Sequence, residues 1–319
     1  MGMGHGMILC LNPGSSSLRF ATYSDVDTEV ASGHINHLKS DCLEGYQKAL
    51  EVAVKGEPSA IGYRVVHGGE LYSRPTVITD AVLERLRSLE RLAPGHLPAA
   101  IATIETARRR FPEIPHIACF DTAFHHGMPE LAKRFALPDE LWNEGVRRYG
   151  FHGLSFEYVV QTLGHDLLER TIIAHLGNGS SMVALRAGQP IETTMGMTPA
   201  GGMMMGSRSG DLDPGVIIHL LREKQLTPEQ LSELINQKSG LKGVSRLTSD
   251  MKTLLEQRDE NGSAALAIEM YCYSARKHIG ALAATLGGLD LLVFTGGIGE
   301  NAQTIRKEIC LGVCRTLRS

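Results

Sequence analysis

The 319-residue sequence has few aromatic residues, little net charge and no long apolar run. Aromatic residues make up 5% of the chain, with one tryptophan, and the formal net charge is −3. Proteins that bind nucleic acids usually present a basic surface, often with aromatic side chains that stack on bases. A membrane-spanning helix needs about 20 consecutive apolar residues, and no run in this chain approaches that length. We therefore expect partners that are neither nucleic acids nor membranes.

The six cysteines lack the spacing of a zinc site or of a redox pair. No two of them form a CxxC motif, and His125, His126 and His175 are not spaced as metal ligands. Several cysteines lie inside apolar runs, as Cys119 does, and we expect them to be small buried residues. Free thiols and the lack of a secretory segment predict a cytoplasmic protein.

Two common nucleotide-binding motifs are also missing. The chain has no GxxxxGKS/T loop, and Gly296-Gly297-Ile298-Gly299 lacks the spacing of the dinucleotide-binding fingerprint. This glycine-rich segment nevertheless lies between a predicted buried strand at residues 290–295 and a predicted helix, where a helix N-terminus can receive an anion. A glycine-lined turn without a ligand is the alternative. Any nucleotide must therefore be bound by a different architecture.

Glycine, by contrast, is abundant, and it clusters in loops that include a short phrase found twice. The copies are Leu11-Asn12-Pro13-Gly14-Ser15-Ser16-Ser17 and Leu176-Gly177-Asn178-Gly179-Ser180-Ser181. Each copy lies between two strand-like runs, which predicts a hairpin whose turn offers backbone N–H groups and hydroxyl groups to phosphate oxygens. One such turn would be ordinary hairpin chemistry. Two copies half a chain apart suggest a duplicated domain with phosphates held between the halves.

The rest of the pattern alternates strands and helices. Strands are predicted at residues 60–67, 116–120 and 290–295, and helices at 80–92, 98–111, 152–163, 214–224, 228–237, 248–257 and 264–286, with a last helix after the 296–301 loop. The length allows two domains, each with its own core. We predict two α/β domains around a cleft, at residues 1–150 and 151–319.

Four charged or polar residues are placed where they could act on an anion. Arg64 ends a predicted strand and Arg208 lies in a loop of small residues, so either guanidinium could bind a carboxylate or phosphate. A salt bridge with a nearby acid is the alternative for each. Asp121 follows the predicted strand 116–120 and could reach a metal ion or cap a turn. His152 could donate a hydrogen bond to developing negative charge, or it could be a structural histidine.

Together these motifs resemble the acetate kinase family of enzymes that form acyl phosphates. The matching segments are residues 12–17, 64–69, 120–125, 148–153, 175–179, 204–214 and 295–301, in the family's order along nearly the whole chain. The resemblance implies the duplicated α/β fold of the actin/hexokinase/Hsp70 type (the ASKHA, ribonuclease H-like architecture) around a nucleotide cleft. It also implies a homodimer.

The family resemblance implies reversible, Mg²⁺-dependent phosphoryl transfer from ATP to acetate or another short-chain carboxylate, giving ADP and acetyl phosphate. Arg64, His152 and Arg208 would hold the carboxylate and stabilise the transferred phosphoryl group. Asp121 would be catalytic and Asn12 would lie near the metal. Arg64, Val66, Phe151 and Pro199 would contact the carboxylate substrate. The residues expected at ATP are Ser15, Ser17, Arg19, His175, Gly177, Asn178, Gly179, Asp250, Lys252, Gly297, Ile298, Gly299 and Asn301.

The chain departs from the family pattern at several positions. Arg19 replaces a usual lysine, Lys252 replaces a usual arginine, and Gly95 replaces a usual leucine of the acyl pocket. The glycine should enlarge this pocket, so we expect propionate or butyrate to be accepted at least as well as acetate. Residues 310–319 do not follow the family pattern, in which a later glutamate helps to hold Mg²⁺. We therefore expect a shortened second domain with an exposed sheet edge. A nucleotide-binding relative without turnover is the alternative function.

Overall fold

The computed structural model describes residues 6–14, 17–24, 28–36, 45, 51 and 57–316. Their contacts divide the chain into two compact units, Met1–His126 and Gly127–Ser319. The domain boundary predicted from the sequence lies later, between residues 150 and 151, and it stays a prediction. Each unit is built around its own sheet.

The first unit contains a six-stranded mixed sheet in the order β3-β2-β1-β4-β6-β5. Its strands are β1 (Met7–Pro13), β2 (Ser17–Ser24), β3 (Thr28–Asn36), β4 (Pro58–Val65), β5 (Thr76–Val77) and β6 (His116–Phe120). Strands β1, β4 and β6 run parallel, whereas β1–β2–β3 form an antiparallel meander. The first predicted hairpin is therefore β1–β2.

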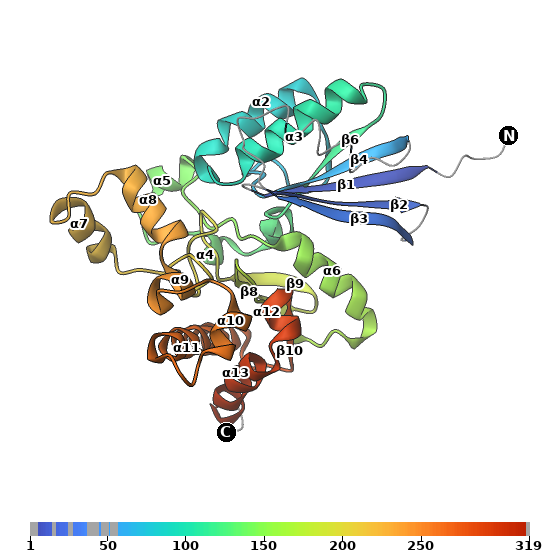
Figure 1. Cartoon of the computed structure of the whole chain (residues 1–319). Helices are drawn as coiled ribbons and strands as arrows, with labels where there is room; N and C mark the ends of the chain where they lie inside the picture. Colours follow the sequence, from blue (N-terminus) through green and yellow to red (C-terminus); the bar gives the residue numbers. More distant parts are fainter. Residues whose placement is uncertain are drawn as a thin grey trace. The chain divides into compact units, whose positions relative to one another are not determined.

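Two helices cover one face of this sheet, α2 (Asp80–Ser88) and α3 (Leu97–Arg110), with the short 3₁₀ helix η1 (Glu90–Leu92) between them (Figure 1). Leu9 and Leu11 of β1 are buried with Ile101 and Ile104 of α3. Because side chains alternate along a strand, the residues between them face the other way. Cys119 lies on that second face of β6 and is only half-buried, so the expectation that it is a core residue is wrong.

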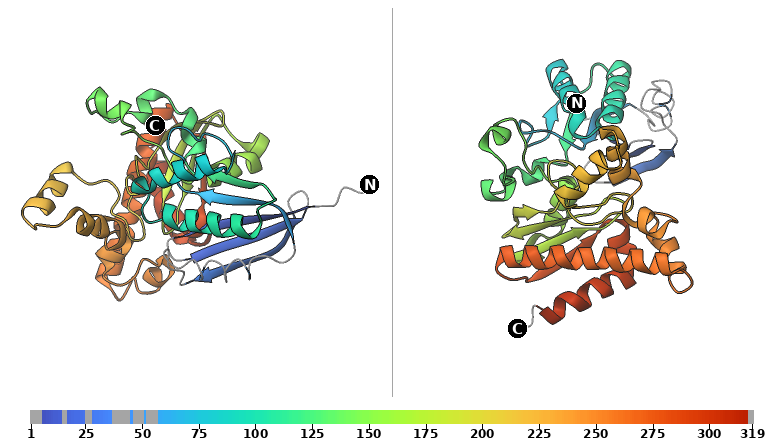
Figure 2. Two further views of the ribbon diagram at one scale, coloured as in Figure 1. Left: turned by 90° about the horizontal axis from the view of Figure 1, so that it is seen from above. Right: turned by 90° about the vertical axis from the view of Figure 1, so that its left-hand side faces the viewer.

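The second unit contains a four-stranded sheet in the order β10-β7-β8-β9. Its strands are β7 (Arg170–His175), β8 (Ser181–Arg186), β9 (Gln189–Thr193) and β10 (Leu291–Thr295). Helix α11 (Gly262–Leu286) runs along one face (Figure 2), and its buried residues include small side chains such as Ala267 and Ala275. Neither α11 nor any other described helix combines the length and hydrophobicity needed to cross a membrane.

Shorter helices connect and flank these strands. They are η2 (Ala123–Gly127), α4 (Glu130–Lys133), α5 (Asp139–Asn143), α6 (Gly153–Leu163), η3 (Gly164–Asp166), α7 (Pro214–Arg222), α8 (Pro228–Gln237), α9 (Gly240–Ser245), α10 (Met251–Glu256), α12 (Gly296–Asn301) and α13 (Gln303–Thr316). The prediction of a loop at 296–301 is wrong, because this segment is helix α12. The N–H groups of Ile298 and Gly299 both donate to the Leu176 carbonyl, which fixes the first turn of this helix beside the hairpin turn.

The two sheets share one strand order. In the first unit β3-β2-β1-β4 is a meander of three antiparallel strands followed by a parallel strand, and β9-β8-β7-β10 repeats this arrangement in the second. Strands β1 and β7 each lead into one copy of the repeated phrase. This correspondence confirms the predicted duplicated α/β fold.

Candidate active site

The first unit brings together Asn12, Arg64 and Asp121 at one edge of its sheet. The Arg64 guanidinium donates to both carboxylate oxygens of Asp121, with N–O distances of 2.5 to 3.1 Å, and its Nη1 donates to Asn12 Oδ1 at 3.2 Å. Asn12 lies near the end of β1, Arg64 near the end of β4, and Asp121 directly after β6. Because these strands are parallel, their carboxyl ends meet, which brings the three side chains together.

The two charged side chains of this cluster differ in their exposure to solvent. The side chain of Asp121 is 2% exposed, whereas that of Arg64 is 34% exposed. The negative charge of Asp121 raises the pKa of the Arg64 guanidinium. The salt bridge considered as the alternative for Arg64 is thus present. Asp121 thus fixes the orientation of the Arg64 side chain, which remains partly exposed and could contact an anion.

Asn12 and Asp121 supply oxygen atoms, the donor type that Mg²⁺ prefers. No group of three or more histidine, cysteine, aspartate or glutamate side chains suited to a metal ion occurs among the described residues. A magnesium ion here would therefore take its other ligands from phosphate oxygens and water, which is usual for this ion. The donor chemistry fits Mg²⁺ bound together with a nucleotide.

The first hairpin turn places two further predicted residues. The Gly14 N–H donates to the Ser17 carbonyl at 2.7 Å and closes the turn. Arg19 pairs with Asn12 across the β1–β2 ladder and is exposed. Because paired residues of an antiparallel ladder lie on the same face, the Arg19 cation shares its face with Asn12. Ser15 lies outside the described residues.

In the second unit two histidine rings are stacked. The centroids of His152 and His175 are 4.3 Å apart, with planes at 23°. Nδ1 of His152 lies 2.7 Å from Ser181 Oγ, and Nδ1 of His175 lies 2.9 Å from Ser155 Oγ. His152 is the N-cap of α6 and His175 ends β7, so the start of the helix and the end of the strand meet here.

The second hairpin turn passes close to His152 and Arg208. A Cβ atom on Gly179 would lie 3.3 Å from both Arg208 Nη1 and His152 Nε2. The two nitrogen atoms therefore flank one small space that exists because residue 179 has no side chain. Arg208 Nη1 also donates to the Pro199 carbonyl at 2.9 Å, which orients the guanidinium.

The same turn lies beside α12. Ser180 Oγ accepts from the Gly177 N–H at 3.2 Å and donates to the Gly177 carbonyl at 2.9 Å, so the turn is tied to itself. A Cβ on Gly177 would lie 3.9 Å from the Gly297 nitrogen. The Asn178 carbonyl accepts from the Gly206 N–H at 3.0 Å. The turn and the helix together form a glycine-rich surface, where a ligand could approach the protein backbone closely.

Three further residues predicted to bind ATP lie at helices α10 and α12. Asp250 caps α10, where its Oδ2 accepts from the N–H and hydroxyl of Thr253 at 2.9 and 2.7 Å. These hydrogen bonds lower the pKa of its carboxyl group. Lys252 is exposed on the same helix, and Asn301 Nδ2 donates to the Gly297 carbonyl at 2.9 Å. The capping role of Asp250 was not predicted.

The predicted lining of the acyl pocket differs in exposure. Val66 and Phe151 are 6% and 1% exposed, respectively. Gly95 is exposed before α3, and a Cβ there would meet no described atom within 4 Å. Ser155 and Ser181 were missed, although Ser181 belongs to the repeated phrase and Ser155 follows His152 by three residues, a helical spacing.

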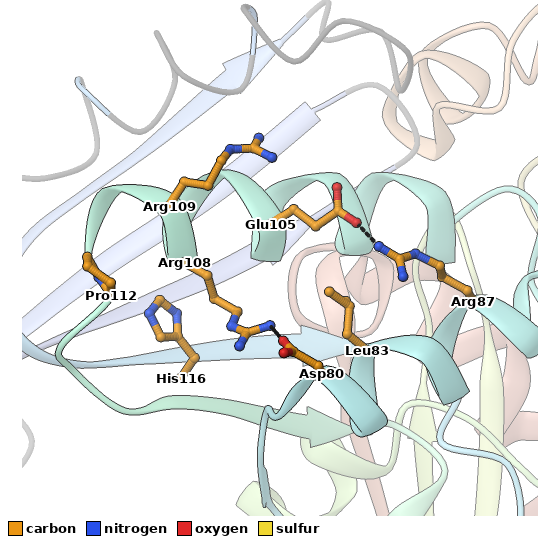
Figure 3. A pocket seen from close by; sticks show the side chains of 8 residues that line it. All are labelled: Asp80, Leu83, Arg87, Glu105, Arg108, Arg109, Pro112 and His116. Atoms are coloured by element: carbon orange, nitrogen blue, oxygen red, sulfur yellow. Dashed lines mark hydrogen bonds and ion pairs between the residues drawn. The ribbon is translucent and has the colours of Figure 1, made fainter.

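A separate pocket of about 480 Å³ lies in the first unit, lined by residues of α2, α3 and the start of β6 (Figure 3). Arg87 pairs with Glu105 at 2.5 Å, and Arg108 pairs with Asp80 at 2.9 Å. Because four of its charged side chains neutralise one another, we assign it no ligand. His116 also lines this pocket and begins the strand that ends before Asp121.

The chain is similar to known proteins in both sequence and fold. Residues 46–315 match the model of the Acetokinase family. Acetate kinase of Rhodopseudomonas palustris is 44% identical, over 95% of this chain and 85% of its own length. The crystal structure of Porphyromonas gingivalis acetate kinase superposes with a TM-score of 0.84 at 36% identity, covering 96% of this chain and 86% of that one. A propionate kinase structure from Francisella tularensis gives 0.85 at 33% identity, covering 98% and 88%. The chain belongs to the acetokinase family.

Proposed function

We propose that this protein is an acetate kinase, which transfers a phosphoryl group reversibly between ATP and acetate to give ADP and acetyl phosphate. Its family membership supports a phosphotransferase with a carboxyl group as acceptor. The observation that carries the proposal is the Gly179 space, flanked by a guanidinium and an imidazole nitrogen. Two nitrogen donors around one small space suit phosphoryl oxygens, whose negative charge must be stabilised during transfer.

Each unit contributes a separate set of groups to the proposed reaction. In the first, Arg64 binds the anionic substrate while Asp121 fixes the plane of its guanidinium. In the second, Arg208 Nη1 and His152 Nε2 donate to oxygens of the transferred phosphoryl group. The backbone around Gly177, Asn178 and α12 approaches the nucleotide phosphates. Such a reaction depends on in-line positioning and charge stabilisation and needs no covalent catalyst.

Mg²⁺ is part of the proposal, with Asn12 and Asp121 as the protein groups that would hold it. When bound, the ion neutralises negative charge on the nucleotide phosphates. Asp121 is fixed by Arg64 in the structure, and Asn12 Oδ1 contacts the same guanidinium. The two oxygen donors are thus oriented before any ion arrives.

We base the proposed preference among carboxylate substrates on the space at Gly95. A Cβ there would meet no described atom within 4 Å, so the position has room for a longer acyl chain. We propose that propionate and butyrate are used at least as well as acetate. Steady-state kinetics with acids of one to four carbons would test this, with Gly95→Leu as the matched variant. The leucine should shift preference toward acetate, and a strict preference for acetate in the parent protein would contradict the proposal.

The decisive experiment separates turnover from binding. ADP formation should depend on acetate, propionate or butyrate, and calorimetry should show ATP binding without any acid. Arg208→Gln should abolish most turnover, because it removes a guanidinium donor beside Gly179, and thermal unfolding would show whether the fold is intact. If ATP binds but no acid supports ADP formation, the protein is instead a nucleotide-binding relative without turnover.

We also propose a homodimer in the cytoplasm. Helix α7 has no buried residue although Val216 and Ile218 are apolar, and Leu266, Met270 and Tyr273 form an exposed stripe on α11. Apolar surfaces of this kind favour association. Free cysteines among the described residues, such as buried Cys272, support a reducing compartment. Sedimentation velocity of the parent protein and of Ile218→Glu would test the dimer.

A further inference from the structure

The stacked histidines are connected by two serine hydroxyl groups that cross between elements. Ser181 pairs with His175 in the β7–β8 ladder, yet its hydroxyl contacts His152, the ring that stacks on His175. Ser155 lies in the first turn of α6, which His152 caps, yet its hydroxyl contacts His175. Each serine therefore contacts the histidine of the other element: Ser181 of β8 contacts His152 at the start of α6, and Ser155 of α6 contacts His175 of β7.

The hydrogen bond at Nδ1 of a histidine is coupled to the position of the ring proton, because a hydroxyl partner either donates to Nδ1 or accepts from it. A neutral imidazole has one N–H donor and one acceptor nitrogen, and the hydrogen bond at one nitrogen selects the form at the other. Ser181 is fully buried, so its hydroxyl contacts His152 where water does not compete freely. If this hydroxyl donates to Nδ1, the proton of the neutral ring must lie on Nε2.

Nε2 of His152 is the atom that matters for the proposed reaction. It lies 3.3 Å from the Cβ position of Gly179, as does Arg208 Nη1. A protonated Nε2 donates to an anionic oxygen in that space, whereas an unprotonated Nε2 repels it. The backbone of His152 has a φ of +60°, which is uncommon for a residue with a side chain, so the ring is presented from a constrained position.

We infer that Ser181 is a positioning residue that keeps the proton of His152 on Nε2 and the ring turned toward Gly179. This inference rests on the proposed function. Ser155 orients His175, the ring on which His152 stacks, and acts one step further from the reacting group. Neither serine is among the groups that contact the substrate in the proposed function.

The experiment is ¹⁵N NMR of histidine-labelled protein at a pH where the rings are neutral, with His152→Gln used to assign the His152 signals. The parent protein should show His152 with its proton on Nε2. In Ser181→Ala the signals should move toward a mixture of the two forms, and Ser181→Thr, which restores a hydroxyl, should return them. Ser155→Ala should alter His175 signals and leave the His152 proton in place. A proton on Nδ1 of His152 in the parent protein would overturn the inference.

Kinetics provide the second readout. Ser181→Ala should lower kcat by about 10- to 100-fold, as expected when one donor to the transferred group is weakened, with KM for ATP and acid little changed. An unchanged kcat in a folded Ser181→Ala protein would also overturn the inference. If the parent protein shows no turnover with any acid, the proposed function fails, while the NMR result still decides the role of Ser181.

Discussion

Gly296 lies so close to Leu176 that a Cβ atom on the glycine would be 2.7 Å from the leucine carbonyl oxygen. The φ of Gly296 is +78°, a conformation that residues with side chains rarely adopt. The same carbonyl accepts the N–H groups of Ile298 and Gly299 at 2.8 and 3.0 Å. The junction of β10 and α12 therefore depends on a glycine at this position.

Gly296→Ala should destabilise the second unit by about 2 kcal/mol or more, because it adds backbone strain and a steric clash. Urea unfolding followed by circular dichroism would measure the change. Gly297→Ala is the matched control, since a Cβ there meets no described atom within 4 Å. This control should unfold like the parent and raise KM for ATP. Equal stabilities for both variants would contradict the prediction.

Local sequence patterns predicted part of the fold and of the candidate site, and missed the parts that depend on distant contacts. Apolar alternation and glycine turns predicted both hairpins, because those signals are local. Strand β3 was missed since its sequence lacks the apolar alternation of a half-buried strand, and it lies at the edge of its sheet. The contacts of Ser155 and Ser181 arise only when α6 meets the β7–β8 hairpin, so no local pattern encodes them. The helix at 296–301 depends on hydrogen bonds to Leu176, more than a hundred residues earlier.

Arg64→Ala should reduce both stability and activity. It leaves the buried carboxylate of Asp121 without its partner, which should lower the free energy of unfolding by about 1 to 3 kcal/mol, less than for a fully buried pair because Arg64 is partly exposed. The double variant Arg64→Ala/Asp121→Asn should recover stability, since no unpaired charge remains, but not turnover. Denaturant unfolding and ADP formation measure the two effects. Restored turnover in the double variant would exclude the proposed anion contact of Arg64.

Gly179→Ala should lower turnover without much loss of stability. The added methyl group would occupy the space 3.3 Å from Arg208 Nη1 and His152 Nε2, and both are ends of side chains that can shift slightly. We expect kcat/KM for ATP to fall by at least about 100-fold, because two donors to the phosphoryl group are blocked together. Thermal unfolding would show whether the fold survives. Normal kinetics in this variant would mean that phosphate binds elsewhere.

Asp250 should have separable structural and binding roles. Asp250→Ala removes the N-cap of α10 and should cost about 1 kcal/mol of stability, whereas Asp250→Asn keeps an oxygen acceptor for Thr253. If the carboxylate also contacts the nucleoside, both variants should raise KM for ATP. If the residue is only a cap, Asp250→Asn should match the parent in both measurements.

Folding stability should fall at acidic pH partly through His116. Burial lowers the pKa of this histidine below its ordinary value of 6.5, with a smaller contribution from the charge of Arg108. Its Nδ1 lies 2.6 Å from the Tyr63 hydroxyl and its Nε2 lies 2.9 Å from the Phe111 carbonyl, so the neutral ring is fully hydrogen-bonded. Below pH 6.5 the unfolded chain binds a proton that the folded chain does not, and stability decreases until the lower folded pKa is passed.

Urea unfolding between about pH 8 and pH 5 would measure this slope. His116→Gln should flatten it, whereas His165→Gln, at an exposed position, should leave it unchanged. Identical slopes for the parent and His116→Gln would show that the pH dependence comes from other groups.

The two sheets share one strand order, but equivalent positions in the two carry different residues. Leu11 pairs with Tyr63, directly before Arg64, while His175 pairs with Thr295. Aligning Leu11 with Leu176 in the repeated phrase therefore sets Arg64 against Gly297. At these two equivalent positions the first copy carries a guanidinium and the second only main chain. Rising ionic strength should therefore weaken an anion contact made at Arg64 more than one made at the Gly297 amide, since salt screens charges far more than it screens short hydrogen bonds from backbone amides.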